Sequence, residues 1–362
     1  MGQSQYIDKF YTITKHMSDV FDKTSRQMGY KAKDKNEHDK WKDAVRKKIS
    51  EISGLDLMEK CSLEPQVIES IQFDEYRRDK IIIQTEPDVW MPVYCLIPNS
   101  INKDKTSRKH PVFIVPHGHG GGKFLAAGAI DILPVKNMYD KFFANKPFFS
   151  LQLVREGFIV FCPDARGAGE RREWMKQSDQ NFHEDTHNAL NNMAISLGYS
   201  LAGMMTWDLM RLLDYIETRE DCDPERIGCG GISGGGMQTI WLSAMDERIK
   251  CAVTSGYFYG FKESFLELPH NCACNFVPNL WKYVDMGDMG ALIAPRPLLI
   301  ESGKKDRLNG KSGIENVIPQ VEITRQAYKL LGAEDRIYHH IHEGGHEWNG
   351  EKTMDFIKKW LL

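Results

Sequence analysis

A serine set among glycines, directly after a predicted strand and before a predicted helix, is the feature that most restricts how this chain can fold. The strand is expected over Arg226–Gly230, the turn reads Gly231-Ile232-Ser233-Gly234-Gly235-Gly236, and a helical stretch begins at Met237. Such a tight strand-to-helix turn leaves no room for side chains two positions before and two positions after the serine. Glycine is therefore required at both positions. The pattern predicts that the Ser233 hydroxyl stands above the edge of a sheet.

The predicted helix after this turn adds a chemical argument. Its first N–H groups and its positive dipole end point toward the serine, where negative charge develops if the serine attacks an acyl group. The alternative is a glycine-rich turn with an incidental serine. The strand before and the helix after the turn favour the catalytic interpretation.

Length and composition are consistent with one large α/β domain with additions. The chain has 362 residues, 41% hydrophobic residues and a formal net charge of −3. Such a weak net charge gives no electrostatic reason to expect a nucleic acid or an anionic membrane as partner, so the substrate is expected to be small or neutral. The sequence leaves open whether the chain forms a homo-oligomer.

Residues Met1–Lys9 contain no apolar run typical of a secretion signal, and no later stretch reaches the roughly 18 uninterrupted apolar residues of a membrane helix. A cytoplasmic location is therefore expected. The eight cysteines have irregular spacing, and several fall within predicted strands. They are expected to be reduced rather than bridged.

The order of predicted elements indicates an α/β fold with a mostly parallel sheet and helices on both faces. Residues 1–66 read as a helical N-terminal extension, and residues 67–362 as the catalytic domain, with an insertion at about 256–292. Strands are expected at Val67–Phe73, Lys80–Gln84, Val89–Ile97, Pro111–Pro116, Phe158–Pro163, Ile227–Ile232, Cys251–Ser255, Pro297–Glu301 and Arg336–His342. Helical spacing is clear at 201–216, 319–331 and 348–361.

A serine hydroxyl needs a base within hydrogen-bond reach, and that base needs an orienting carboxylate. His346 is the best candidate base among twelve histidines, because it lies in a glycine-rich loop between the last strand and the last helix. Asp306 follows the preceding strand and is favoured as the acid. Glu301, at the end of that strand, remains the alternative, with Asp306 then capping a turn.

An oxyanion hole would need one N–H group after the nucleophile and another from the loop after the first parallel strand. Gly234 supplies the first, and His119 in Pro116-His117-Gly118-His119-Gly120-Gly121-Gly122 is expected to supply the second. A phosphate-binding loop is the alternative for these glycines, but the following Lys-Ser/Thr pair and the full spacing are missing.

Several histidines and cysteines could instead bind a metal. His117 with His119, and His340 with His342, are paired imidazoles, and His270, Cys272 and Cys274 form a possible zinc cluster. No carboxylate-rich motif accompanies the histidine pairs, and the cysteine cluster lacks a second CxxC-type pair. We therefore expect no metal and no cofactor, and packing of the insertion is favoured for the cysteines.

Several segments together resemble the α/β-hydrolase superfamily, in its dienelactone-hydrolase-like and acetyl-xylan-esterase-like branch. The likeness covers about Val67–Leu362 and is carried by Val115-Pro116-His117-Gly118-His119-Gly120, Pro163-Asp164-Ala165-Arg166-Gly167-Ala168-Gly169-Glu170, Gly203-Met204-Met205-Thr206-Trp207-Asp208-Leu209-Met210-Arg211, Asp223-Pro224-Glu225-Arg226-Ile227-Gly228, Ile293-Ala294-Pro295-Arg296-Pro297-Leu298-Leu299 and Gly303-Lys304-Lys305-Asp306. The resemblance implies Ser233 as nucleophile, Asp306 as acid and His346 as base. Dienelactone hydrolases use a cysteine nucleophile, so the serine in this chain favours ester substrates over dienelactones.

The expected function is a serine carboxylic-ester hydrolase that removes acetyl or other short acyl groups from a carbohydrate or small molecule. The carbohydrate part rests on the resemblance and on aromatic residues of the insertion that could stack on a sugar or pack in the core: Tyr257, Phe258, Tyr259, Phe261, Trp281 and Tyr283. The alternatives are a methyl- or aryl-ester hydrolase, a peptidase-like amidase, a metallohydrolase, or a binding protein that has lost catalysis.

Overall fold

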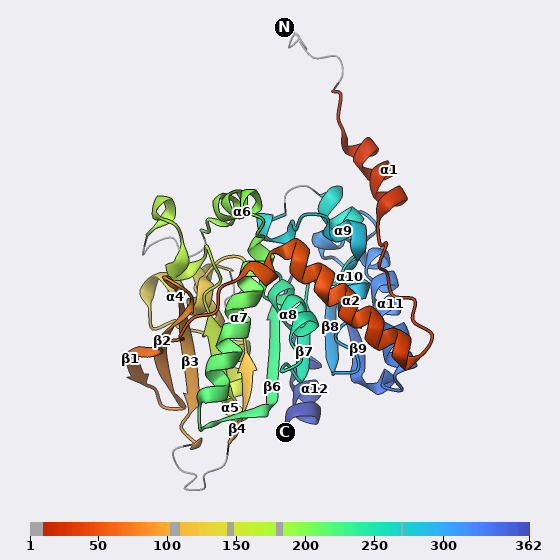
Figure 1. Ribbon diagram of the computed structural model, residues 1–362. Helices are drawn as coiled ribbons and strands as arrows, with labels where there is room; N and C mark the ends of the chain where they lie inside the picture. The colour runs from red at the N-terminus through yellow and green to blue at the C-terminus, as the bar shows by residue number, and fades with distance from the viewer. Residues whose placement is uncertain (1–9, 102–108, 143–147, 179–183, 269–270) are drawn as a thin grey trace.

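A nine-stranded sheet forms the centre of the described part of the chain (Figure 1). The computed structural model describes residues 10–101, 109–142, 148–178, 184–268 and 271–362. The strands lie in the order β1-β2-β3-β5-β4-β6-β7-β8-β9. Their bounds are β1 Gln66–Gln72, β2 Tyr76–Glu86, β3 Val89–Pro98, β4 His110–Ile114, β5 Ile159–Pro163, β6 Cys222–Ile232, β7 Cys251–Ser255, β8 Leu298–Gly303 and β9 Ile337–His342.

The first three strands form an antiparallel meander, and β5 pairs antiparallel with β3. From β5 onward every neighbouring pair is parallel. Because parallel strands are covered on both faces, β5, β7 and β8 consist entirely of buried residues. The predicted mostly parallel sheet with an antiparallel start is confirmed.

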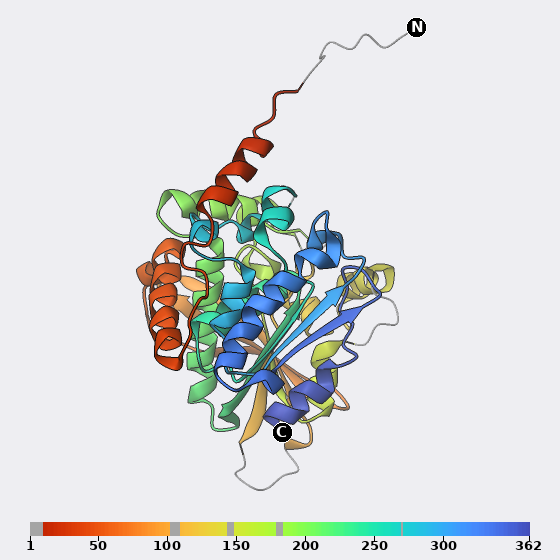
Figure 2. The same ribbon diagram turned by 90° about the vertical axis from the view of Figure 1, so that its right-hand side faces the viewer.

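Helices cover both faces of the sheet (Figures 1 and 2). Helices α2, α7, α8, α10 and α11 contribute to one apolar core, and α3, α5 and α12 contribute to the core on the opposite face. The helix bounds are α1 Thr14–Thr24, α2 Lys35–Ser53, α3 Gly122–Ala126, α4 Leu133–Phe142, α5 Phe149–Arg155, α6 His187–Ser196, α7 Leu201–Thr218, α8 Gly234–Met245, α9 Leu280–Tyr283, α10 Met286–Ala291, α11 Ile318–Leu330 and α12 Thr353–Leu361.

Helix α2 shows how local signals fix an element of the predicted N-terminal extension. Asp34 caps its start by accepting a hydrogen bond from the Glu37 N–H group, and Gly54 ends it in a left-handed conformation. Val45 and Ile49 are fully buried in the same core as α7 and α8. Residues 1–9 of the extension lie outside the described residues, and the division of the chain at residue 66 remains a prediction.

Three elements begin four or more residues away from their predicted start, and one of them is β2, which begins at Tyr76 rather than at Lys80. Helix α12 begins at Thr353 rather than at Trp348, because the chain still turns at Gly350, whose φ of 74° is left-handed. Strand β6 begins at Cys222, five residues earlier than expected. Helices α3 to α6 were not predicted individually, since they are short or lack a clear apolar stripe.

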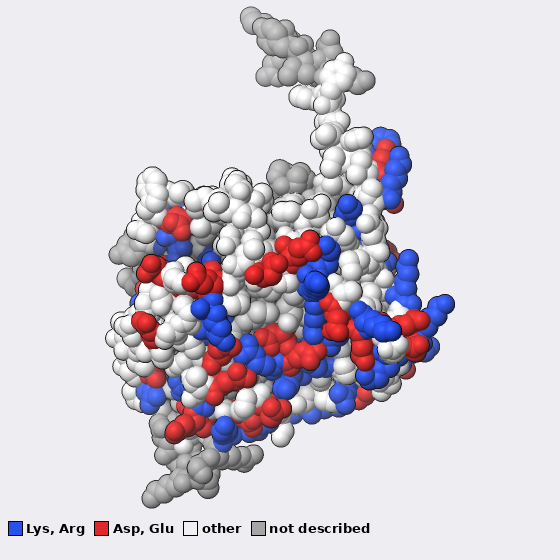
Figure 3. Space-filling model, in the orientation of Figure 1, with Lys and Arg blue, Asp and Glu red and all other residues white. Residues whose placement is uncertain are grey.

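Charges of both signs alternate over the face that carries α2 and α7 (Figure 3). This mixture agrees with the near-neutral net charge and gives that face no single-sign field. All eight cysteines are free thiols. Among the described residues, none of the helices is both long enough and apolar enough to span a bilayer.

A buried ionic network ties α7 to the loop after β5. Asp208 on α7 accepts hydrogen bonds from Arg166 Nε at 2.9 Å, Arg171 Nη1 at 2.7 Å and Thr85 Oγ1 at 2.6 Å. Burial alone would raise the pKa of Asp208, but the charges of Arg166 and Arg171 outweigh burial and lower this pKa to about 2. The loop after β5 is therefore held to α7 by an ionised carboxylate.

We predict that Asp208→Asn lowers the free energy of unfolding by about 3 kcal/mol at pH 7, because it removes the carboxylate partner of the buried Arg171 guanidinium and leaves Arg166 with Glu86 as its remaining counter-charge. The lowered pKa stabilises the fold above the unfolded value of about 3.9, and this contribution is lost as pH falls toward 2. The difference from wild type should therefore shrink below about pH 4. Urea unfolding of both proteins at several pH values measures this difference in the free energy of unfolding.

Asp39→Asn is the matched control, because Asp39 forms an exposed pair with Lys35 one helical turn away. Its unfolding midpoint should equal that of wild type. Equal midpoints for wild type and Asp208→Asn at pH 7 would contradict this account of the network.

Candidate active site

Ser233 occupies the turn between β6 and α8 in a strained backbone conformation. Its φ is 57° and its ψ is −120°, a region that residues other than glycine rarely adopt. The Ser233 N–H group donates to the Ser255 carbonyl at the end of β7, at 2.9 Å. The predicted strand–turn–helix geometry is thus present, with the serine at its tip.

The glycines on either side of Ser233 are explained by the loop that crosses them. A Cβ atom on Gly235 would lie 2.3 Å from the Pro116 carbonyl oxygen, and one on Gly231 would lie 2.7 Å from the same atom. Backbone atoms cannot give way as a flexible side chain can, so a larger residue would displace the loop after β4. Glycine is therefore required at both positions because the backbone of the loop after β4 lies against the backbone of the Ser233 turn.

The structure brings His346 and Asp306 together. His346 Nδ1 lies 2.8 Å from Asp306 Oδ2, and the other carboxylate oxygen, Oδ1, accepts a hydrogen bond from the Leu308 N–H group at 2.9 Å. The Asp306 side chain is 1% exposed, whereas that of His346 is 34% exposed. The carboxylate is therefore fixed in the interior, and the imidazole reaches toward the surface.

The same sheet edge holds this pair and the serine. A Cβ atom on Gly256, directly after β7, would lie 3.1 Å from the His346 ring and 3.4 Å from Asp306 Oδ2. The neighbouring residue, Ser255, accepts the backbone hydrogen bond of Ser233. With Nδ1 turned to Asp306, Nε2 is the ring nitrogen left for a proton transfer, and among the described residues it has no hydrogen-bond partner.

Glu301, the alternative acid, lies elsewhere. Its side chain is fully buried, and its Oε1 atom accepts hydrogen bonds from the Gly350 N–H group at 3.0 Å and from Thr353 Oγ1 at 2.9 Å. Glu301 thus fixes the start of α12. Of the two candidate acids, Asp306 is the one that contacts His346.

His117 attaches the loop after β4 to the segment after β5. Its Nε2 atom accepts from the Ala165 N–H group at 3.0 Å, so Nδ1 carries the proton and donates to the Gly118 carbonyl at 2.7 Å. Burial lowers the pKa of His117, which keeps the ring neutral as these two bonds require. Because both nitrogens have backbone partners, His117 positions the loop and is not available as a metal ligand.

His119 lies directly over the start of α8. A Cβ atom on Gly234 would lie 3.4 Å from the His119 backbone nitrogen and 3.1 Å from its ring. The two N–H groups predicted to form the oxyanion hole therefore belong to backbone segments in contact.

Lys123 and Asp164 anchor the far end of this loop, and the sequence did not single them out as a pair. Both side chains are fully buried, and Lys123 donates to Asp164 through Nζ and through its backbone N–H group, each at 2.7 Å. Glu170 also accepts from Lys123 Nζ. Asp164 and Glu170 both lie in the segment Pro163–Glu170, which carries part of the family resemblance. That resemblance was the available signal for the pair.

A pocket of about 340 Å³ opens at Ser233. Its wall is mostly polar, and Tyr257 in it donates to Asn275 Oδ1 at 2.7 Å. The lining residues are His119, Asp185, Asn188, Ser233, Gly234, Tyr257, Tyr259, Asn271, Cys272, Asn275 and Leu308. Of the six aromatic residues considered as a sugar platform, Tyr257 and Tyr259 line this pocket. Their side chains are nevertheless buried, as are those of Phe258 and Phe261, and Trp281 and Tyr283 pack against the same core.

Comparison with known proteins identifies the family. A family model described as "Abhydrolase family" matches residues 3–352. The chain belongs to this Abhydrolase family. The match includes the helices before β1, which the sequence-based resemblance had left out. The family and the architecture confirm the predicted α/β-hydrolase fold.

Individual relatives extend this result. The chain is 29% identical over 311 residues to "Putative hydrolase YtaP" of Bacillus subtilis (strain 168), covering 82% of this chain and 93% of the relative. A Bacteroides fragilis NCTC 9343 protein described as a "putative acetyl xylan esterase" superposes with a TM-score of 0.75 at 20% identity, covering 94% and 84% of the two chains. "Methylesterase BT1017" superposes with a TM-score of 0.66 at 20% identity, covering 96% and 67%. These two structures share the fold.

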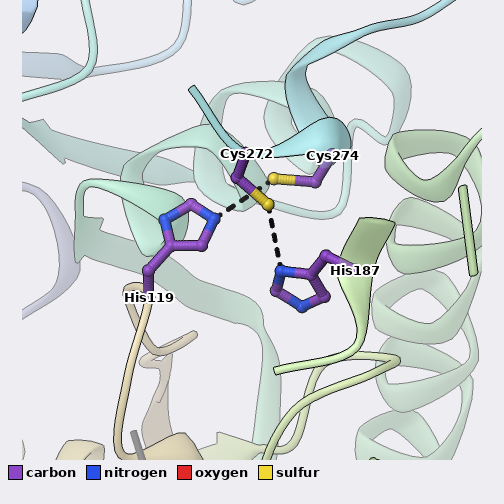
Figure 4. Close-up of side chains that lie close together, drawn as sticks. All are labelled: His119, His187, Cys272 and Cys274. Carbon is purple, nitrogen blue, oxygen red and sulfur yellow. Dashed lines mark hydrogen bonds between the residues drawn. The ribbon is translucent and has the colours of Figure 1, made fainter. Parts of the chain in front are cut away.

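The other candidate metal pairs do not converge on one point. His342 Nδ1 accepts from the Gly344 N–H group, and His340 Nε2 lies 3.1 Å from Asn349 Oδ1. His270 lies outside the described residues. In contrast, His119, Cys272 and Cys274 meet a residue that the sequence analysis missed, His187 at the start of α6 (Figure 4). No motif surrounds His187, so sequence spacing alone offered no signal for it.

Proposed function

We propose that this protein is a serine carboxylic-ester hydrolase that releases acetyl or other short acyl groups from a carbohydrate or small molecule. The observation that carries the proposal is the strained Ser233 turn at the same sheet edge as the hydrogen-bonded His346 and Asp306. A nucleophile, a base and an orienting acid are the groups that acyl transfer needs.

In the proposed reaction, Ser233 Oγ attacks the ester carbonyl carbon while His346 Nε2 accepts its proton. Asp306, which lies 2.8 Å from Nδ1, holds the ring orientation and stabilises the imidazolium. The N–H groups of Gly234 and His119 stabilise the oxyanion of the tetrahedral intermediate. His346 then returns the proton to the leaving alcohol, and an acyl-enzyme remains on Ser233.

The second half of the reaction repeats these steps with water. His346 takes a proton from water as its oxygen attacks the acyl carbon, and the collapse of the second tetrahedral intermediate returns the proton to Ser233 Oγ and frees the carboxylic acid. The active-site residues are regenerated, and no cofactor enters the balance.

The size and polarity of the pocket support a small, polar substrate. A volume of about 340 Å³ lies at the small end of ligand sites, and three asparagines and Asp185 offer hydrogen bonds of the kind that hydroxyl groups accept and donate. The similarity to the structure described as a "putative acetyl xylan esterase" points in the same direction. The proposed substrate is therefore an acetylated sugar or short oligosaccharide.

A methyl-ester hydrolase is the second candidate, favoured by the structural similarity to Methylesterase BT1017. The same catalytic groups would serve both reactions, but the sugar would then be on the acyl side of the ester and methanol would leave first. Measuring both acetate and methanol release distinguishes the two substrates.

We predict that wild type releases acetate from acetylated xylo-oligosaccharides and that Ser233→Ala lowers kcat by at least about 10⁴-fold, since the catalytic groups act as a unit. Acetate is measured enzymatically, with methyl-esterified oligogalacturonides tested in parallel for methanol. Folding of the variant is checked by its thermal unfolding. Equal acetate release by wild type and Ser233→Ala would contradict the proposed nucleophile.

The two candidate acids give a matched pair of variants. We predict that Asp306→Asn lowers kcat by roughly 10³- to 10⁴-fold, because an amide cannot stabilise the imidazolium. Glu301→Gln keeps an oxygen for Gly350 and Thr353 and should retain kcat within about threefold, with any loss in stability instead. The reverse ranking on the most active ester substrate would assign the acid role to Glu301.

A further inference from the structure

Four metal-ligating side chains meet at the wall of the active-site pocket (Figure 4). One ligand atom from each of His119, His187, Cys272 and Cys274 lies within 4.8 Å of the other three. His119 belongs to the loop after β4 and His187 to the start of α6, while both cysteines belong to the segment after β7. The cluster therefore joins three parts of the chain that are far apart in sequence.

The contacts within the cluster pair each histidine with one sulfur. His119 Nε2 lies 3.3 Å from Cys274 Sγ, and His187 Nδ1 lies 3.1 Å from Cys272 Sγ. His187 and Cys274 are buried, whereas Cys272 is half-buried and His119 is exposed at the pocket. An ion at the centre would thus be reached from the pocket side.

We propose that His119, His187, Cys272 and Cys274 bind one zinc ion. Two imidazole nitrogens and two sulfurs are a donor set that zinc takes in tetrahedral sites, whereas the harder calcium and magnesium ions require oxygen ligands. With Zn–S bonds of about 2.3 Å and Zn–N bonds of about 2.1 Å, tetrahedral ligands lie roughly 3.4 to 3.8 Å apart. The two nitrogen–sulfur contacts, at 3.1 and 3.3 Å, are slightly shorter than this spacing, and the outer limit on the separations among the four ligand atoms, 4.8 Å, is longer. Small side-chain movements would therefore complete the site.

The proposed ion has a closed shell of four protein ligands, which is the arrangement of structural rather than water-activating zinc. Binding converts both thiols to thiolates and releases their protons, so affinity should increase with pH. This site revises the expectation of no metal, since one ligand was missed in the sequence and two others were assigned to packing.

The ion would also fix the backbone of His119. The ring of this residue would be a ligand while its N–H group lies over Gly234, so zinc would hold the second oxyanion donor in place. His119 would then position the loop and stabilise charge through separate atoms. This consequence rests on the proposed function, whereas zinc binding itself does not.

The direct test is the zinc content of the full-length protein purified without chelator and then dialysed, measured by plasma mass spectrometry. Wild type should hold about one zinc per chain, and Cys272→Ser, Cys274→Ser and His187→Asn should each lose affinity by at least about tenfold. Cys61→Ser is the matched control, because Cys61 is a half-buried free thiol outside the cluster, and it should retain the zinc of wild type.

Cobalt replacement tests the geometry without any variant. Wild-type protein stripped with a chelator and loaded with Co²⁺ should show the intense visible bands of a tetrahedral site and the near-ultraviolet charge transfer of thiolate ligands. Less than about 0.1 zinc per chain after zinc loading together with no cobalt spectrum would overturn the proposal. A Cys272–Cys274 disulfide detected by mass spectrometry in the metal-free protein as purified would overturn it as well.

Ser233→Ala separates this inference from the proposed function. This variant should bind zinc like wild type while lacking ester hydrolysis. Removing zinc from wild type should lower kcat at least about tenfold, with recovery on adding zinc back, because an oxyanion donor loses its support. Stoichiometric zinc in a protein without esterase activity would leave the metal site standing and reject the proposed function. Unchanged kcat after zinc removal would reject the positioning role of the ion.

Discussion

The contact between the Pro116 carbonyl oxygen and the two glycines that flank Ser233 is the constraint on which the rest of the site depends. Cβ atoms at Gly231 and Gly235 would come within 2.7 and 2.3 Å of this oxygen, so the loop after β4 rests directly on the turn. The position of His119 over Gly234 follows from this contact. Close packing of two backbones thus sets the spacing between the serine and the proposed oxyanion donors.

Buried polar groups keep that loop in position from the other side. His117 receives the Ala165 N–H group, and Lys123 forms a fully buried ion pair with Asp164. The segment that supplies both partners is itself attached to α7 through Arg166 and Asp208. These groups act through the loop rather than on a substrate. Each of these charges has a buried partner. Removing one member of such a pair should therefore lower the free energy of unfolding more than removing one member of an exposed surface pair.

Much of this arrangement could be predicted from the sequence, for physical reasons. The turn at Ser233 needs glycines that no other residue can replace, and buried parallel strands such as β5 and β7 are continuous apolar runs with clear ends. Asp306 and His346 each follow a strand of the same sheet, so the order of the elements places them at one edge. The sequence favoured Asp306 over Glu301 but left both possible, because element order does not show which carboxylate turns toward the histidine ring; in the structure Asp306 makes that contact.

The proposed zinc-binding cluster could not be predicted in full from sequence. His187 lies in a segment without a recognisable motif, and it reaches Cys272 only because α6 and the segment after β7 pack at the same sheet edge. Such convergence of residues that are 85 positions apart is a property of the tertiary fold. Likewise, α12 begins late because Gly350 adopts a left-handed conformation, which helical spacing alone does not reveal.

The account as a whole depends on Ser233 being a reactive nucleophile. The most direct measurement is the intact mass of the folded protein after treatment with a fluorophosphonate, followed by peptide mapping of the modified residue. The account predicts a single adduct on Ser233 in wild type and no adduct in Ser233→Ala. An unmodified folded wild type, or an adduct on another residue that persists in Ser233→Ala, would contradict it.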